Sequence, residues 1–224
     1  MRISKRILLF LWVAILAMNL QAKGKDVYAC QLVLASGESL NGFMQDAKIV
    51  KHGQDNLRNM VSVNFSSTKD DQPTTYKAED IKEMYLTIGT ERHHFISAYA
   101  LKSMTMPKNL KSGSKKYLWY VVYEGKNFYG LASESSDSYA YQNGRAISFE
   151  TTKTTTLSFL DKKTDVVVSY YQYVNGFSIG QKKFLKMCFE RYPKMVDYIN
   201  SSDFKLKALK DDPNVLVKKL DALY

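Results

Sequence analysis

The chain has 224 residues, of which 45% are hydrophobic and 13% aromatic, so it can bury a sizeable core. Charged residues make up 24% and prolines number only 4, which excludes intrinsically disordered, collagen-like and proline-rich linker proteins. The 32 Lys and Arg outnumber the 22 Asp and Glu, giving a formal net charge of +10 at pH 7.

Residues 1–22 have the layout of a secretory signal peptide. Arg2, Lys5 and Arg6 precede the apolar run Ile7–Met18, and the small residue Ala22 closes the segment. A helix over this run rises about 18 Å, well short of a hydrocarbon core of about 30 Å. We therefore expect cleavage near Ala22 and no transmembrane anchor afterwards. The mature protein would be periplasmic, extracellular or associated with the outer membrane.

Two cysteines, Cys30 and Cys188, lie near opposite ends of the mature chain. Export permits a disulfide between them, which would join the first strand to a C-terminal helix. Two separate buried thiols are the alternative, and the sequence leaves both open. The charged segment 23–26 separates Cys30 from the apolar run, which argues against a lipid anchor on that residue.

Residues 23–106 predict a first β module. Val27–Ala35 is an apolar β-rich run, a turn is expected at 36–38, and Ser39–Met44 is its hairpin partner. Val61, Val63 and Phe65 alternate with polar residues, which places all three on one face of a strand. Further strands are expected at 81–88 and 94–100.

A basic loop over residues 107–116, rich in Lys, Ser and Gly, is expected to separate this module from a second one over 117–180. Strands of the second module are expected at 117–123, 127–132, 146–149, 155–160 and 166–174. About ten short strands without βαβ alternation predict antiparallel sheet, closed as one or two small barrels or a sandwich. A doubly wound nucleotide-binding fold is disfavoured.

Residues 181–224 predict a C-terminal helical segment. Apolar residues recur at helical spacing from Gln181 to Tyr192, and Pro193 stops this helix. A last helix is expected to begin with Asp212 as N-cap and Pro213 as its first residue. The predicted class is thus α+β, mainly β, with small antiparallel barrels or a sandwich followed by helices.

Several short motifs resemble exported proteins of unknown function from Bacteroidota-type bacteria. The segments that carry the resemblance are Gln31–Leu34, Tyr76–Ile81, Tyr117–Trp119, Glu124–Lys126 and Phe184–Pro193. The resemblance implies an envelope location and a β-rich body with a helical tail. It implies no activity and no functional residue.

The segment 176–180 matches the G-x-S-x-G pattern of a hydrolase nucleophile elbow, with Ser178 as nucleophile. That fold places its histidine after the serine, whereas His52, His93 and His94 all precede it. Ser178 with Gln181 also forms a helix-capping box, which is the favoured interpretation. A carboxylate pair cannot be assigned from spacing alone. No catalytic residue is predicted.

The sequence predicts neither a metal site nor a cofactor. His93 and His94 are neighbours, so on a strand they point to opposite faces and cannot share one ion. Zinc sites usually need three or four ligands, and nothing in the spacing recruits His52. There is no P-loop and no G-x-G-x-x-G.

Positive charge gathers between Glu91 and Glu124, a stretch without a single acidic residue. Its basic residues are Arg92, Lys102, Lys108, Lys111, Lys115 and Lys116. They are candidates for binding an anionic glycan or lipid headgroup, and a solvated lysine loop is the favoured alternative. No pattern for nucleic-acid binding is present.

Tyrosine is abundant, with 16 in the chain. Trp119, Tyr171 and Tyr173 are candidates for stacking on a ligand, and core positions are the favoured alternative. On a regular strand Tyr171 and Tyr173 share a face and Tyr170 takes the other.

These observations lead to an expected function. We expect a non-enzymatic, exported module that binds an envelope protein or an anionic glycan or lipid. A periplasmic hydrolase using Ser178 or a carboxylate pair is the alternative.

Overall fold

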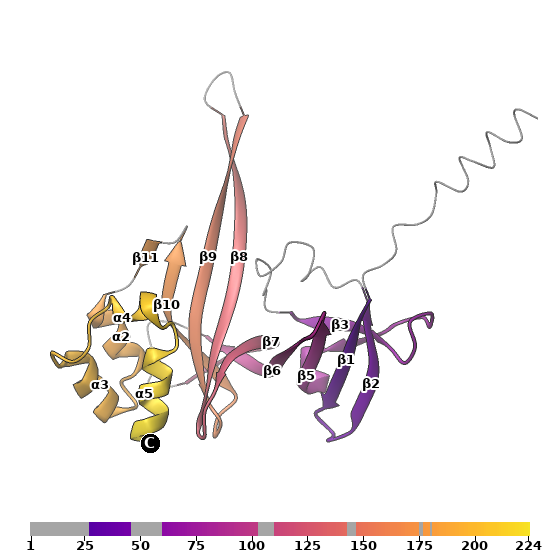
Figure 1. Cartoon of the computed structure of the whole chain (residues 1–224), viewed down its shortest axis with the longest axis horizontal. Helices are drawn as coiled ribbons and strands as arrows, with labels where there is room; N and C mark the ends of the chain where they lie inside the picture. The colour runs from indigo at the N-terminus through magenta and orange to yellow at the C-terminus, as the bar shows by residue number, and fades with distance from the viewer. Residues whose placement is uncertain (1–26, 46–59, 103–109, 143–146, 175–176, 180) are drawn as a thin grey trace, which may run out of the picture.

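A computed structural model describes residues 27–45, 60–102, 110–142, 147–174, 177–179 and 181–224 (Figure 1). The predicted signal peptide lies outside these residues. The strands are β1 (Val27–Leu34), β2 (Ser39–Gln45), β3 (Ser62–Ser66), β4 (Thr74–Lys77), β5 (Ile81–Ile88), β6 (Glu91–Leu101), β7 (Ser112–Glu124), β8 (Phe128–Gln142), β9 (Ile147–Asp161), β10 (Val166–Val174) and β11 (Phe177–Ile179). The helices are the 3₁₀ helix η2 (Ala78–Asp80) and the α-helices α2 (Lys182–Cys188), α3 (Pro193–Asn200), α4 (Ala208–Asp211) and α5 (Val215–Leu223). The predicted class, α+β and mainly β with helices at the C-terminus, is confirmed.

The strands form one hydrogen-bonded sheet in the order β11-β10-β9-β8-β7-β6-β5-β1-β2-β3-β4. Neighbours in this order are antiparallel, and a short parallel pairing joins β10 to β6, with Val166 opposite Tyr99 and Val167 opposite Ala100. The backbone N–H of Tyr99 also donates to the carbonyl of Asp165 over 2.7 Å. Because β6 thus pairs with both β7 and β10, the strands β6 to β10 close into a small barrel.

The paired strands β6 and β7 form a wall between two cores. Phe95 and Leu118 pack into the core of the N-terminal strands, whereas their chain neighbours Ile96 and Trp119 pack into the core inside the β6–β10 barrel. Successive side chains of a strand point to opposite faces, so one pair of strands serves both cores. Residues 112–116, which were expected to belong to a loop, are the first part of β7.

The N-terminal core lies between β1, β2, β3 and β5. Leu32, Met84 and Leu86 are completely buried there, and Phe65 is 4% exposed. The prediction that Val61 shares the inward face of Val63 and Phe65 is wrong. Val61 is 50% exposed because it precedes β3, where the regular alternation has not yet begun.

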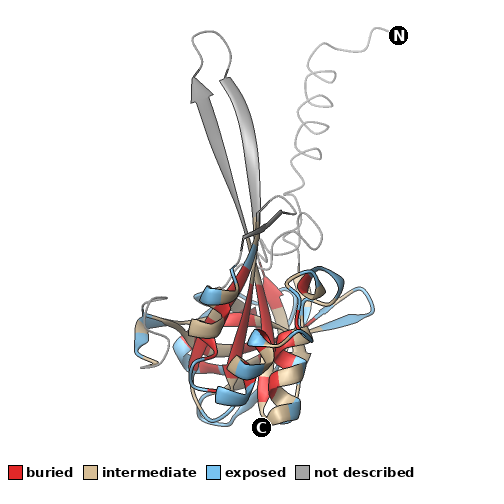
Figure 2. Ribbon diagram, turned by 90° about the vertical axis from the view of Figure 1, so that its left-hand side faces the viewer, coloured by how far each residue is buried: buried red, intermediate tan, exposed pale blue. Residues whose placement is uncertain are grey.

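The helices cover the outer face of β8, β9 and β10 and bury a third core (Figure 2). Phe159 of β9 stacks on Phe189 beyond α2, with ring centroids 4.8 Å apart. The single helix expected over 181–192 is shorter than predicted. It ends at Cys188, and Pro193 begins α3 at a position where its missing N–H costs nothing.

The last helix begins at Val215, two residues later than predicted. Asp212 still stabilises its start, because its carboxylate accepts the backbone N–H of Asn214 and the ammonium of Lys218, both at 2.9 Å. Burial opposes ionisation of Asp212, but the hydrogen bonds from Lys218 and Asn214 outweigh it and lower the pKa of this carboxyl.

Strands β8 and β9 form a hairpin that extends away from the rest of the protein (Figure 1). Their register runs from Phe128 opposite Asp161 to Gln142 opposite Ile147. The ladder of β8 with β7 reaches only Ala132, and that of β9 with β10 only Thr154. Beyond these points the two strands pair with each other alone within the described sheet.

Candidate functional site

The structure divides the six basic residues expected to bind an anion. Lys102, Lys111, Lys115 and Lys116 lie where β6 ends and β7 begins, and the backbone N–H of Lys102 donates to the carbonyl of Lys111. Arg92 lies ten residues earlier, about 33 Å along β6, so it does not join them. Lys108 lies outside the described residues.

Arg92 instead has neighbours on β1 and β5. Its guanidinium lies over the ring of Tyr85, 4.1 Å from the centroid, and donates to the side-chain oxygen of Gln31 over 2.9 Å. Lys116 similarly lies over the ring of Tyr99 at 5.1 Å. Both cations thus pack on the protein's own aromatic rings.

The three aromatic candidates lie in or against the core. Trp119 is 4% exposed and donates its indole N–H to the carbonyl of Ala98 over 3.0 Å. Tyr171 is 2% exposed, and the Tyr173 hydroxyl donates to the carbonyl of Leu209. Trp119 and Tyr171 are therefore buried in the core, and Tyr173 is partly buried against it.

Tyr170 and Tyr171 are both buried, contrary to the expectation from strict alternation. The register between β10 and β9 shifts between Ser169 and Tyr171, so Tyr170 is an extra residue without a partner opposite it. This bulge lets consecutive side chains enter the same core.

The disulfide alternative is not realised. Cys30 and Cys188 are both free thiols, the first buried in the N-terminal core and the second in the core beneath the helices. Burial raises the pKa of each thiol to about 12. Both behave as small apolar residues, as the second interpretation of the sequence expected.

Ser178 lies in β11, opposite Tyr173 of β10, so it does not stand at a turn that enters a helix. The N-cap residue of α2 is Gln181, and its side chain makes no capping hydrogen bond. The predicted capping box is therefore wrong, because β11 extends the sheet by three residues where a cap was expected. The strand-to-helix elbow on which the nucleophile interpretation depends is likewise missing from the described backbone.

His93 and His94 point to opposite faces of β6. His93 Nδ1 lies 3.2 Å from the Tyr120 hydroxyl, and His94 stacks on Tyr85 with ring centroids 4.5 Å apart. Within the described residues no His, Cys, Asp or Glu groups could hold a metal ion together. His52 lies outside the described residues.

His94 is the centre of a cluster of charged and aromatic side chains from four strands. Its Nε2 lies 3.7 Å from Glu83 and its Nδ1 lies 3.6 Å from Glu124. Tyr129 meets the ring edge-on, and Lys162 lies over Tyr129 at 4.2 Å and pairs with Glu124 at 3.5 Å.

Burial is the largest influence on His94 and lowers its pKa despite the two carboxylates beside it. The ring is therefore neutral at pH 7. Burial, with a hydrogen bond to Glu83, raises the pKa of Tyr85 to about 12. The cluster joins the four strands through ring contacts and through the charged groups of Glu83, Glu124 and Lys162.

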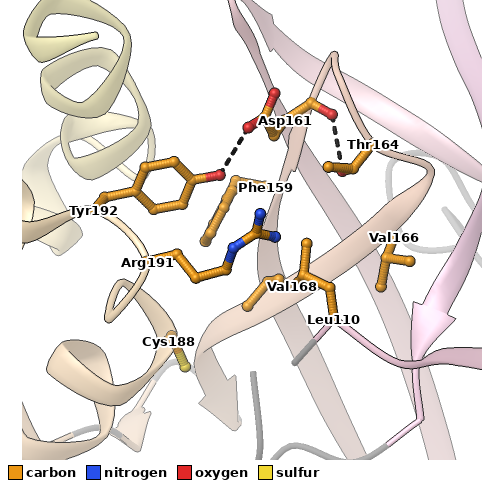
Figure 3. Close-up of a pocket in the computed structure, with 9 residues that line it drawn as sticks. All are labelled: Leu110, Phe159, Asp161, Thr164, Val166, Val168, Cys188, Arg191 and Tyr192. Atoms are coloured by element: carbon orange, nitrogen blue, oxygen red, sulfur yellow. Dashed lines mark hydrogen bonds between the residues drawn. The ribbon is translucent and has the colours of Figure 1, made fainter. Parts of the chain in front are cut away.

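A small cavity lies between β9, β10 and the segment after α2 (Figure 3). The Tyr192 hydroxyl donates to the carboxylate of Asp161 over 2.9 Å, and Cys188 and Arg191 line the cavity. Its volume is about 10 Å³, room for about one water molecule. This cavity is too small for a substrate.

An open groove of about 650 Å³ lies between α2 and α3. Phe184, Met187 and Val196 line it and are only partly buried, although they belong to well-packed helices. Lys183, Lys186 and Glu190 also line it. The site offers an apolar floor within a mostly basic rim.

The helical spacing of apolar residues from Gln181 to Tyr192 predicted a helix but not this groove. Leu185 and Cys188 are indeed buried, but Phe184 and Met187 repeat the same spacing one position earlier and turn to the groove. The second pair of apolar residues on this short helix was the feature of the sequence that could have predicted a second contact surface.

No protein-family model, curated protein or solved structure matches the chain. None of the described helices is long and apolar enough to cross a membrane. Function is therefore inferred from the geometry alone.

Proposed function

We propose that the protein is an exported, non-enzymatic binding module of the cell envelope, and that the groove between α2 and α3 receives a segment of an envelope protein. The observation that carries this proposal is the partly exposed apolar floor of Phe184, Met187 and Val196 on otherwise well-packed helices. Apolar grooves between helices are common sites for an anchoring side chain of a partner.

The charge around the groove defines the partner. Lys183 and Lys186 contribute two positive charges against the single negative charge of Glu190. The occupant is accordingly an apolar segment flanked by Asp or Glu, because opposite charges at the rim guide and orient binding. The net positive charge of the chain favours the approach of such a segment.

Three observations support a binding role over catalysis. Both thiols are buried with a pKa of about 12, so neither is a nucleophile near neutral pH. The titratable cluster around His94 is packed by its own aromatic neighbours. The cavity that holds Asp161 and Tyr192 has room for about one water molecule.

The test is site-specific photo-crosslinking in native cell envelopes. A photoreactive residue replaces Lys183 at the groove, and a matched control replaces Lys207, an exposed lysine that does not line it. We expect one exported protein to be crosslinked from position 183 only, through an apolar segment with acidic flanks. The variant Met187→Asp should abolish this crosslink, because a carboxylate on the floor repels both the apolar anchor and its acidic flanks.

Crosslinks that are equal at both positions, or a captured segment without acidic flanks, would contradict the proposal. Lipid crosslinked in place of protein would contradict it as well. The fold of each variant is checked by its thermal unfolding.

A second candidate function rests on the four lysines of the segments where β6 ends and β7 begins. The backbone bond that joins Lys102 to Lys111, together with the positive charge of this region, supports binding of an anionic glycan or lipid headgroup there. The combined variant Lys111→Ser and Lys115→Ser should weaken binding to anionic vesicles and flatten its salt dependence. Unchanged binding with an unchanged salt dependence would discard this candidate.

A further inference from the structure

A second groove, distant in sequence from the helices, lies where β2 and the β3–β4 hairpin separate. β2 pairs with β3 only from Phe43 to Gln45, so in the described sheet the segment 39–42 has no strand beside it on this edge. The groove has a volume of about 430 Å³, within the range of about 300–1,000 Å³ that is typical of ligand sites. Its lining includes Asn41, Ser67, Asp71, Gln72, Thr74 and Tyr76.

The loop that forms one side of the groove is held in place by a buried glutamine. The side-chain amide of Gln45, which is 5% exposed, donates to the Ser66 hydroxyl and to the carbonyl of Asp71, each over 3.0 Å. The Ser66 hydroxyl in turn donates to the carbonyl of Thr68 over 2.7 Å. The Asp71 carboxylate accepts the backbone N–H of Thr68 over 3.1 Å.

These bonds order the loop before any ligand arrives. A ligand that binds beside Asp71 and Gln72 does not have to pay for ordering them, and this preorganisation favours affinity. A buried amide without hydrogen-bond partners would destabilise the fold, and here the amide of Gln45 has partners in the loop.

An aromatic ring is positioned in the same groove. Tyr76 is half-buried and meets Phe65 edge-on, with ring centroids 5.9 Å apart and an interplanar angle of 85°. Phe65 is buried in the N-terminal core, so it fixes the orientation of the tyrosine. Tyr76 thus combines a broad apolar face with a polar tip at the groove.

The polar groups of the groove select against anionic ligands. No lysine or arginine is among the described residues that line it, and Asp71 is its only ionisable carboxylate. The amides of Asn41 and Gln72 and the hydroxyls of Ser67 and Thr74 can each donate and accept hydrogen bonds. A ligand with many hydroxyl groups and no negative charge satisfies this set, whereas a phosphate or carboxylate would face Asp71 without a compensating cation.

We infer that this groove binds a neutral carbohydrate. The C–H face of a sugar ring lies on Tyr76, and its hydroxyls bond with Asn41, Asp71 and Gln72. This site does not depend on the proposed protein partner, because no residue is shared between the two grooves.

The test is binding of the purified protein to an array of neutral oligosaccharides beside sulfated and uronate-containing ones, followed by titration calorimetry with the best neutral ligand. Tyr76→Ala removes the stacking face and should weaken binding by about tenfold or more. Thr75→Ala is the matched control, because Thr75 is exposed on the same strand but does not line the groove. It should leave the affinity unchanged.

Asn41→Ala and Gln72→Ala serve as further variants, since both residues are exposed and their truncation spares the core. Each should weaken binding while thermal unfolding stays as in the parent protein. The inference is overturned if no neutral oligosaccharide binds at millimolar concentration, or if only anionic glycans bind. It is equally overturned if the Tyr76, Asn41 and Gln72 variants all bind as the parent does.

Discussion

Asp221 of α5 binds the turn between β7 and β8 at the place where Gly125 leaves room for it. Its carboxylate accepts the backbone N–H groups of Lys126, Asn127 and Phe128 at 2.9, 2.7 and 3.2 Å. A Cβ on Gly125 would lie 2.5 Å from the Asp221 carboxyl carbon. The final helix is thereby attached to a strand connection 95 residues earlier in the chain.

We predict that Asp221→Ala destabilises the protein by about 2 kcal/mol, because three backbone donors lose a charged acceptor. Gly125→Ala should cost about 1–3 kcal/mol by steric conflict with that carboxylate. The two changes in one chain should cost less than their sum, since the conflict disappears with the side chain. Chemical denaturation of the two single variants and the double variant measures this coupling, and strict additivity would contradict the contact.

The same carboxylate gives a prediction for acid conditions. Burial opposes its ionisation, but the hydrogen bonds from Asn127, Lys126 and Phe128 outweigh burial and lower the pKa of Asp221. A carboxyl whose pKa is lower in the folded state stabilises the protein above its unfolded pKa, and this contribution is lost as pH falls through the folded value. Denaturation at pH 3 and pH 6 should therefore differ less for Asp221→Asn than for the parent protein.

A second pH dependence comes from His94, with the opposite proton preference. Burial lowers its pKa in the folded state, so near pH 6.5 the unfolded chain binds the proton more readily. Stability should thus decrease as pH falls below about 6.5, until the folded ring is itself protonated.

Urea denaturation at pH 7.5 and at pH 5.5 measures this effect. His94→Gln should reduce the difference between the two pH values, whereas His93→Gln on the opposite face of β6 should leave the contribution of His94 in place. Glu83, Tyr85, Arg92, Glu124, Tyr129 and Lys162 are the charged and titratable neighbours that influence His94. Equal pH dependence in both variants would contradict the assignment.

The sequence predicted the arrangement of the core better than the chemistry of the surface. Strand periodicity and the apolar stripes of the last 44 residues depend on local spacing, and the β-rich class and the C-terminal helices follow from them. The closure of β6 to β10 into a barrel could not be predicted, because it depends on the parallel pairing of Val166 with Tyr99, which are far apart in the chain.

The surroundings of the candidate site residues could not be predicted for a related reason. Arg92 and Lys116 look alike as positive charges in a sequence, yet each packs on a different ring, Arg92 on Tyr85 of β5 and Lys116 on Tyr99 of β6. Tyr171 is buried together with Tyr170 because of a β-bulge, and a bulge cannot be predicted from residue spacing. Gln45, which orders the β3–β4 loop, looks like an ordinary exposed residue at the end of a hairpin strand.

Gln45 gives the next prediction. Replacing it with leucine removes the hydrogen bonds from its amide to the Ser66 hydroxyl and to the carbonyls of Lys69 and Asp71, so these acceptors lose their buried donor. We expect a loss of about 1–3 kcal/mol in the free energy of unfolding. Faster amide hydrogen exchange should be confined to residues 66–72. Exchange that rises uniformly over the N-terminal strands would instead indicate a packing defect.

The last prediction concerns the two thiols. Cys30 and Cys188 lie in separate cores and are free, so the protein should contain two titratable thiols after denaturation under non-reducing conditions. In the native state both should react with a thiol reagent at pH 8 far more slowly than a free cysteine, because burial raises their pKa to about 12. Cys188→Ser should leave the reaction rate of the Cys30 thiol unchanged. It should lower the free energy of unfolding by about 1–3 kcal/mol, since it buries a hydroxyl that the core only partly satisfies. Protein isolated from an oxidising compartment with no titratable thiol would contradict the arrangement of both cores.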